Sequence, residues 1–109
     1  MYKVRTSIDD ERKAKLIAQE IVESHSAVSV HIKKIETVYA WNDEVVNDFE
    51  WEIECLTTCP SEVTNLVCGM HSYELAEMIV EPLIVPERIR EWCLQWCEKE
   101  EDYKVKGDN

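Results

Sequence analysis

The stretch VYAWNDEVVNDFEWEIE, residues 38–54, sets the architecture that this sequence predicts. Apolar and polar residues alternate on both sides of the tripeptide NDE, which is the period of a β-strand. Asn and Asp tolerate positive φ angles, so NDE is expected to form a turn although it contains neither Gly nor Pro. The stretch therefore predicts an unusually long hairpin whose returning strand runs from about Val45 to Leu56.

The returning strand carries a row of acids, Glu50, Glu52 and Glu54, that could be a cation site, a subunit contact or a solvated face. Side chains two residues apart leave a strand about 6.8 Å from each other. Oxygen ligands lie at about 2–2.6 Å from a hard cation, so neighbours in this row cannot easily share one ion. A polar face paired with Lys33, Lys34 or basic residues of a partner fits this spacing better.

The strand before the turn, residues 27–41, changes its apolar phase in the middle. Val28, Val30 and Ile32 share one face, whereas Ile35 and Tyr39 belong to the other. Such a slip predicts a β-bulge near residues 33–34, because a bulge bends a strand and keeps its apolar side inward.

The rest of the chain supplies the partners of this hairpin. Strand alternation and helical apolar spacing predict, in order, a strand over 2–8, a helix over 9–24, a helix from Pro60, a strand within 77–85 and a helix from Pro86. The order βαββαβα predicts an α+β, ferredoxin-like sandwich with an antiparallel sheet and an extra C-terminal helix. Residues 1–109 are expected to form a single domain, with a flexible tail from about residue 101.

Composition limits the classes of function. Twelve basic and 23 acidic residues give a net charge of −11, which argues against binding nucleic acid. No apolar run approaches the roughly 20 residues that cross a bilayer, and no signal peptide is expected. Five cysteines, an odd number without a CxxC pair, indicate reduced thiols and a cytoplasmic location.

Candidate metal ligands occur at helical spacing in two places. Cys68 and His71 are three residues apart near a helix end, although His71 could instead bind helix carbonyls. Cys93 and Cys97 are four residues apart and could hold a soft metal with further ligands, but the same positions suit small core residues. With two glycines and no Ser-His-Asp or Cys-His pairing to argue from, we do not expect an enzyme.

Five motifs in order resemble the CutA divalent-cation tolerance proteins. They are VRTSIDDERKAKLIAQEIVE (4–23), AVSVHI (27–32), VYAWNDEVVNDFE (38–50), HSYELAEMI (71–79) and EWCLQW (91–96). The resemblance covers about residues 3–96. It implies a ferredoxin-like fold related to PII-type signalling proteins, a homotrimer built by the long hairpins, and a link to copper or another divalent cation as the candidate ion.

The resemblance also suggests site residues. At the subunit interface it implies Tyr39, Trp41, Glu50 and Trp51, with Glu50 in an ion pair between subunits. His71 keeps the family's histidine, and with Met70 it forms the candidate metal site, since a thioether and an imidazole suit Cu(I).

Strand one departs from the family. Arg5 stands where some members have a cysteine, and a protonated guanidinium offers no lone pair to a metal. Arg5, Tyr73 and Glu74 are candidates for lining a cleft. The sequence therefore favours a trimeric divalent-cation tolerance protein; the alternative is a PII-like trimeric module that binds a small ligand without a metal.

Overall fold

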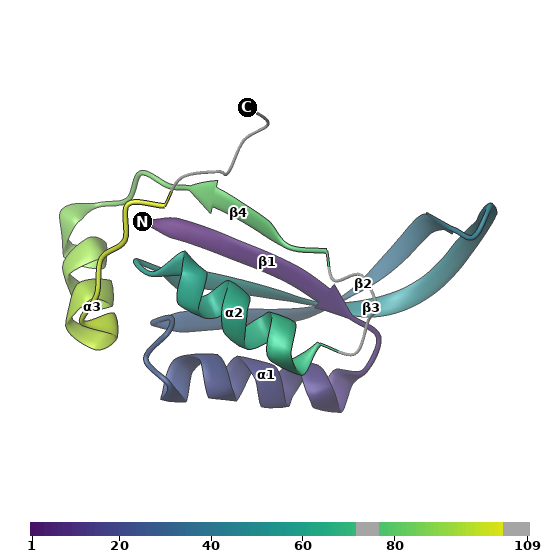
Figure 1. The fold of residues 1–109 in the computed structure, drawn as a ribbon, viewed down its shortest axis with the longest axis horizontal. Helices are drawn as coiled ribbons and strands as arrows, with labels where there is room; N and C mark the ends of the chain where they lie inside the picture. Colours follow the sequence, from purple (N-terminus) through teal and green to yellow (C-terminus); the bar gives the residue numbers. More distant parts are fainter. Residues whose placement is uncertain (72–76, 104–109) are drawn as a thin grey trace.

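The computed structural model describes residues 1–71 and 77–103, and Figure 1 shows its arrangement. Its elements follow the order β1 (Tyr2–Ile8), α1 (Glu11–Glu23), β2 (Ser29–Trp41), β3 (Glu44–Thr57), α2 (Pro60–Met70), β4 (Ile79–Pro82) and α3 (Glu87–Cys97). This confirms the predicted α+β sandwich and its additional C-terminal helix. None of the helices in the described ranges is long and apolar enough to cross a membrane.

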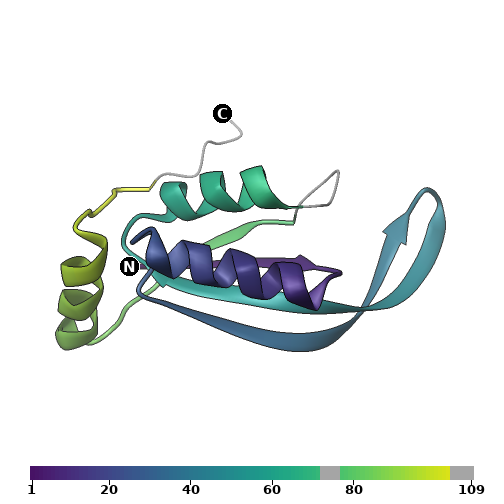
Figure 2. The same cartoon turned by 90° about the horizontal axis from the view of Figure 1, so that it is seen from below.

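The four strands form one antiparallel sheet in the order β2-β3-β1-β4. Helices α1 and α2 lie side by side against one face of the sheet, and both views, Figures 1 and 2, show this arrangement. We call the other side of the sheet, which neither helix covers, the open face. Alternate residues of each strand point to this face, and they include the acids at positions 50, 52 and 54.

The main core lies between the sheet and the two helices. It joins buried residues of the strands, of α1 and of α2, chiefly Val4, Ile8, Ile53, Cys55, Ala14, Ile17, Ile21, Val63 and Val67. Helix α1 begins where the Asp10 carboxylate accepts a hydrogen bond from the Lys13 backbone N–H at 3.1 Å, which satisfies one end-of-helix donor. The 3.6-residue apolar period thus places one stripe of each helix on the sheet.

The hairpin of β2 and β3 pairs without interruption from Ser29 opposite Leu56 to Trp41 opposite Glu44. Asn42 and Asp43 have φ angles of 51° and 62°, which confirms the expected turn. The predicted bulge at residues 33–34 is wrong, because no extra residue interrupts this register. The apolar phase of β2 changes for another reason. Near the base of the hairpin, Val30 and Ile32 face the helices, whereas further out Ile35, Tyr39 and Trp41 of β2 lie on the open face.

Helix α3 packs at the end of the sheet, beside the C-terminus of α1 (Figure 1). The Trp96 indole donates a hydrogen bond to the Val22 carbonyl at 3.0 Å. The His25 ring stacks on Trp96, with 3.9 Å between the ring centroids, and its Nδ1 lies 2.7 Å from the Trp96 carbonyl oxygen. These contacts hold α3 against the sandwich.

Residues 98–103, which we call the strap, return from α3 toward the start of α2. The Thr58 hydroxyl donates to the Lys99 carbonyl, and the Glu101 N–H donates to the Thr58 carbonyl. The Glu101 carboxylate accepts from the Ser61 N–H at 2.7 Å, in the first turn of α2. The Tyr103 N–H donates to the Tyr2 hydroxyl at 3.1 Å. Glu101 and Tyr103, in the stretch expected to begin a flexible tail, are thus bonded to the domain in this structure.

Candidate functional site

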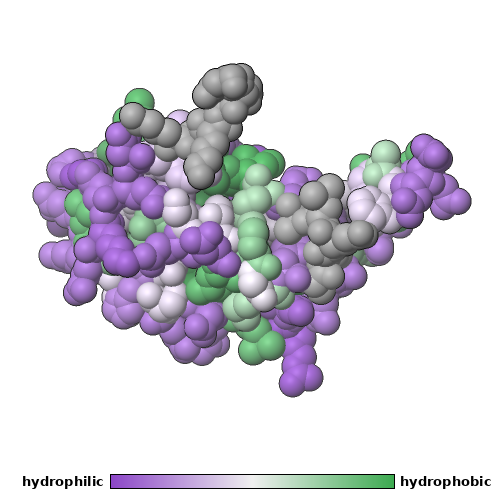
Figure 3. Space-filling view, in the orientation of Figure 1, coloured by the Kyte–Doolittle hydropathy of each residue, from purple (hydrophilic) through white to green (hydrophobic). Residues whose placement is uncertain are grey.

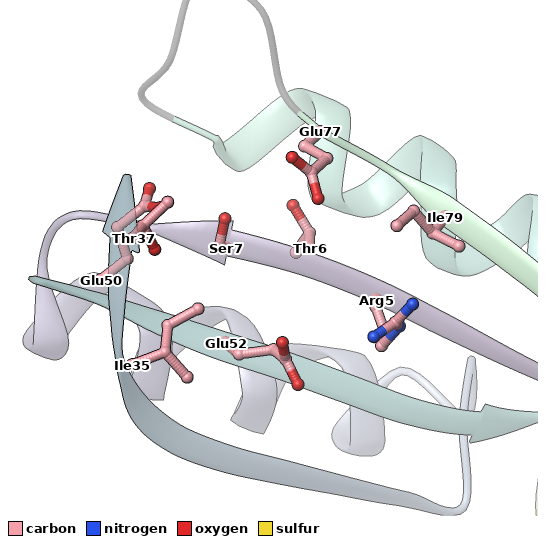
Figure 4. A pocket seen from close by; sticks show the side chains of 9 residues that line it. All are labelled: Arg5, Thr6, Ser7, Ile35, Thr37, Glu50, Glu52, Glu77 and Ile79. Atoms are coloured by element: carbon pink, nitrogen blue, oxygen red, sulfur yellow. The ribbon is translucent and has the colours of Figure 1, made fainter. Parts of the chain in front are cut away.

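A cavity of about 80 Å³ opens on the open face, and Figure 4 shows its lining side chains. They come from β1, β2 and β3, from the start of β4 and from the residue two before it: Arg5, Thr6, Ser7, Ile35, Thr37, Glu50, Glu52, Glu77 and Ile79. Because β1 lies between β3 and β4, the sheet order alone brings these segments together. We call this the open-face cavity.

Polar atoms without partners concentrate around the open-face cavity. Arg5 Nε, Thr6 Oγ1 and Thr37 Oγ1 are buried and make no hydrogen bond within the described part of the chain. All three residues line the cavity. An unsatisfied buried polar group costs about 1–3 kcal/mol, so an outside partner that bonds to Arg5 Nε or Thr37 Oγ1 would stabilise the site. Thr6 belongs to the helix-facing side of β1, with Val4 and Ile8.

Arg5 contributes the positive charge of the open-face cavity. Its Nη2 lies 3.0 Å from Glu81 Oε1, across the pairing of β1 with β4. This ion pair is partly exposed and contributes little to stability. Its main effect is to hold the guanidinium over the sheet.

In the row of three acids, two are partly exposed and form ion pairs, and the third is buried. Glu52 and Glu54 form ion pairs with Lys33 and Lys3, each at 3.4 Å. The preferred interpretation of the row, a polar face paired with lysines, is thus confirmed for Glu52. Glu50 differs, because it is only 5% exposed and lies in the cavity wall.

His71 ends α2 and touches the edge of the same region. Its Nε2 lies 2.7 Å from the carbonyl oxygen of Ser7, a lining residue of the cavity. Such a contact with a carbonyl places the ring proton of neutral His71 on Nε2. Met70 instead packs partly buried against the main core, and Cys68 is exposed.

No three His, Cys, Asp or Glu side chains in the described ranges are arranged to hold a metal ion. Tyr73 and Glu74, the other candidates for the cleft, lie outside the described residues. The structure therefore places Arg5 and Glu50 in one cavity, and it ties His71 to the neighbouring Ser7.

The tip of the hairpin projects beyond the sandwich and carries apolar side chains, as Figure 3 shows. Tyr39 and Trp41 are 38% and 42% exposed, and Val38, Val45 and Phe49 are exposed as well. Lys34 lies over the Phe49 ring, with 4.4 Å from Nζ to the ring centroid. Trp51 lies closer to the base and packs against the main core. Apolar side chains are thus exposed on both faces of the projecting hairpin in the single chain.

Some residues of the cavity were not identified as candidates from the sequence. Ile35, Thr37 and Glu77 line the cavity, although none was a candidate. The phase change after Ile32 was the available signal for the first two, because it moves Ile35 and Thr37 to the open face.

An antiparallel four-stranded sheet with two helices on one face defines a ferredoxin-like fold. The chain belongs to the family described as CutA1 divalent ion tolerance protein, whose sequence profile matches residues 2–100.

Known proteins support this assignment. The chain is 32% identical over 77 residues to Protein CutA of Homo sapiens, an alignment that covers 68% of this chain and 43% of the human protein. The chain thus aligns with less than half the length of that relative. CutA1 of the psychrotrophic bacterium Shewanella sp. SIB1 is 30% identical, with a TM-score of 0.78 over 86% of this chain and 92% of that one. The PII-like protein CutA of Nostoc sp. PCC 7120 shares the fold at 21% identity, with a TM-score of 0.80 over 84% of this chain and 92% of its own.

Proposed function

We propose that this chain acts in divalent-cation tolerance as a cytoplasmic homotrimer that is not an enzyme. The observation that carries the proposal is the combination of an apolar hairpin tip with unsatisfied polar atoms in the open-face cavity. Both features make sense if another copy of the chain covers them. Family membership supports the role in divalent-cation tolerance.

Strand β2 supports assembly through the hairpin. It is 13 residues long and lies at the edge of the sheet, so one side of its backbone has no strand partner among the described residues. Long exposed edges of this kind pair readily with a strand of another chain. We infer that Tyr39, Trp41, Glu50 and Trp51 contribute to contacts between subunits, with Glu50 paired to a basic group of a neighbour.

Light scattering at micromolar concentration tests the trimer. We expect a mass of about 38 kDa, three times the 12.8 kDa of one chain. A stable 12.8 kDa monomer would refute the assembly.

Copper is the ion proposed for His71 and Met70. The imidazole and the thioether suit Cu(I), but His71 would have to exchange its contact with Ser7 for the metal. We therefore expect weak binding. Titration with Cu(I) should shift the ring signals of His71 and the methyl signal of Met70 in NMR spectra, and His71→Ala should abolish the shift of the Met70 methyl signal. Unchanged signals at stoichiometric copper would contradict this site.

A PII-like module for a small ligand is the second candidate. The buried Arg5 Nε favours it, because it offers a hydrogen bond to an acceptor in the open-face cavity. Arg5, Tyr73 and Glu74 would then line a cleft between subunits and bind an anionic molecule. Thermal-shift screening of small anions against the native chain and Arg5→Ala separates the two functions, since only a ligand held by Arg5 loses its stabilising effect in the variant.

A further inference from the structure

Three of the five cysteines gather in a small cluster at the α3 end of the sheet. Cys59, Cys93 and Cys97 are all buried, and Met1 packs against them. We call this group the thiol cluster. It is a second core, separate from the main one between the sheet and the helices, and the proposed function does not use it.

Cys97 connects the other two cysteines of the thiol cluster. Its sulfur lies 3.8 Å from that of Cys93, one turn earlier on α3, and its thiol also shares a hydrogen bond with that of Cys59, which directly precedes α2. The Cys59 backbone N–H donates to the Thr57 hydroxyl at 2.8 Å, and that hydroxyl donates to the Ser26 carbonyl. Cys59 is thus positioned independently of α3, and the three thiols follow one another on two separate elements.

Only one of the two neighbouring pairs suits a stable disulfide. Residues four apart on a helix have Cβ atoms about 5–6 Å from each other, whereas a disulfide needs about 3.5–4.5 Å. Cys93 and Cys97 can therefore be bridged only if the last turn of α3 is distorted. Cys97 is the last residue of that helix and Cys59 belongs to another element, so helical geometry does not hold this second pair apart.

The three thiols also differ in acidity. The hydrogen bond from the Cys97 thiol lowers the pKa of Cys93 to about 7, although burial acts in the opposite direction. The pKa of Cys59 is raised by its hydrogen bond with Cys97 and by burial. For Cys97, the hydrogen bond with Cys59 lowers the pKa, but the bond to Cys93 and burial together raise it by more. Since the thiolate is the nucleophilic form, Cys93 is the member of the cluster that reacts first with an oxidant.

We propose that the thiol cluster is a site of reversible oxidation by hydroperoxides, in which Cys93 reacts with the oxidant and Cys59 and Cys97 end in a disulfide. In the first step, the Cys93 thiolate attacks one peroxide oxygen and the O–O bond breaks. The sulfur is oxidised to a sulfenic acid, and the peroxide is reduced to an alcohol, or to water from hydrogen peroxide, with one proton taken from solvent.

Two exchanges then transfer the oxidation to Cys59. The Cys97 sulfur attacks the sulfenic sulfur of Cys93, the S–O bond breaks, and water leaves with the Cys97 proton. Cys59 next attacks the Cys97 sulfur in this strained disulfide, so that Cys93 leaves as a thiolate and the Cys59 proton passes to solvent. Relief of the helix strain and the low pKa of the leaving Cys93 both favour this exchange. In total, two thiols and one hydroperoxide give one disulfide, one alcohol and one water.

The disulfide fastens α3 to the sandwich. In the reduced chain, α3 is held by the hydrogen bond from the Trp96 indole to the Val22 carbonyl and by the stacked His25 ring. Cys97 is the most exposed member of the cluster, at 4%, and the strap that follows it is bonded to Thr58. A small hydroperoxide therefore reaches the cluster when the strap opens, and the disulfide afterwards keeps α3 in place.

Hydrogen peroxide tests the site in the reduced, full-length chain, with a metal chelator present to suppress metal-catalysed oxidation. After alkylation of the remaining thiols, peptide mapping by tandem mass spectrometry should find Cys59 joined to Cys97 of the same chain and Cys93 alkylated. Dithiothreitol should reverse the bridge. The oxidised chain should melt about 5 °C or more above the reduced chain, because the bridge closes a long loop.

Four variants separate the roles of the cysteines. Cys59→Ser and Cys97→Ser should each abolish the mapped disulfide and the rise in melting temperature. Cys93→Ser should form the same disulfide at least tenfold more slowly, because it lacks the thiolate that reacts first. The matched control, Cys68→Ser at an exposed thiol, should keep the native rate and the native rise in melting temperature.

Peptide mapping of the unmodified chain does not depend on how the variants fold. Cluster thiols that stay reduced, a lasting bridge between Cys93 and Cys97, or a bridge that only links two chains through Cys68 would overturn the site. Equal oxidation rates of the native chain and Cys93→Ser would overturn the role of Cys93. The thiol cluster is separate from His71, from the open-face cavity and from the hairpin tip, so each of these outcomes leaves the proposed function intact.

Discussion

His71 Nε2 lies 2.7 Å from the Ser7 carbonyl oxygen and so links the end of α2 to the end of β1. This contact joins two elements that are 64 residues apart, next to the open-face cavity. His71 therefore has a structural role whether or not it binds a metal.

His71→Ala should lower the free energy of unfolding by about 1 kcal/mol, the net value of a typical hydrogen bond. Urea denaturation followed by circular dichroism measures the change. Cys68→Ala is the matched control, because Cys68 lies exposed on the same helix and should alter stability by less than about 0.5 kcal/mol. Equal effects of the two substitutions would contradict a structural role for His71.

Replacing Tyr39 and Trp41 together with Glu should dissociate the assembly without unfolding the chain. Both side chains are exposed near the hairpin tip, so the introduced carboxylates would be solvated in the monomer. In an interface between subunits they would be buried without solvent, which is unfavourable. Light scattering should show a smaller mass at micromolar concentration, with an unchanged circular dichroism spectrum. Leu16→Glu, on α1 with 58% exposure, should leave the mass unaltered. If the double variant keeps the native mass, these aromatics lie outside the interface.

Arg5→Cys should raise the affinity for Cu(I) at the open-face cavity about tenfold or more. The substitution places a soft thiolate ligand in β1 and removes a fixed positive charge that repels cations. Arg5→Ser separates the two effects, because it removes the charge without adding a thiolate. Chelator competition with the native chain and both variants measures the affinity. Equal affinities of the Cys and Ser variants would rule out a thiolate contribution.

Stability should decline at alkaline pH partly because of Cys55. Its pKa is raised from 9.0 to about 12 by burial and by the nearby Glu54. A raised pKa means that the protonated thiol contributes its full stability below pH 9 and loses it as the pH rises toward 12. Between pH 9 and 11 this loss amounts to about 1.4 kcal/mol per pH unit.

Urea denaturation from pH 7 to 11 measures the loss. Cys55→Ala should be less stable than the native chain at pH 7, because the substitution leaves a small cavity, and its stability should fall less steeply above pH 9. Parallel pH curves for the two proteins would show that Cys55 titrates alike in the folded and unfolded states.

The element order, the turn at Asn42 and Asp43 and the helix start at Pro60 could be predicted from the sequence, because local patterns determine each of them. The bulge was predicted wrongly for a tertiary reason. The alternation of apolar and polar residues predicts which face of a strand is buried. It does not show whether a helix of the same chain or another surface buries that face. Ile35 and Tyr39 follow the pattern on the open face without any break in pairing.

The contacts of the candidate residues were harder to predict than the helices and strands, because those contacts depend on tertiary structure. Cys93 and Cys97 were visible as a pair, but Cys59 joins them only because β3 ends beside α3. Arg5 Nε and Thr37 Oγ1 make no hydrogen bond within residues 1–71 and 77–103, and their burial likewise follows from the sheet order, which no local pattern contains.

The unbroken register of the hairpin restricts how its length can change. Deleting one residue from β2 would turn every side chain beyond that point to the opposite face, so Tyr39 and Trp41 would exchange places with Val38 and Ala40. Deleting two residues from each strand keeps every remaining side chain on its face and only shortens the projection. Functional relatives with longer or shorter hairpins should therefore differ by even numbers of residues per strand.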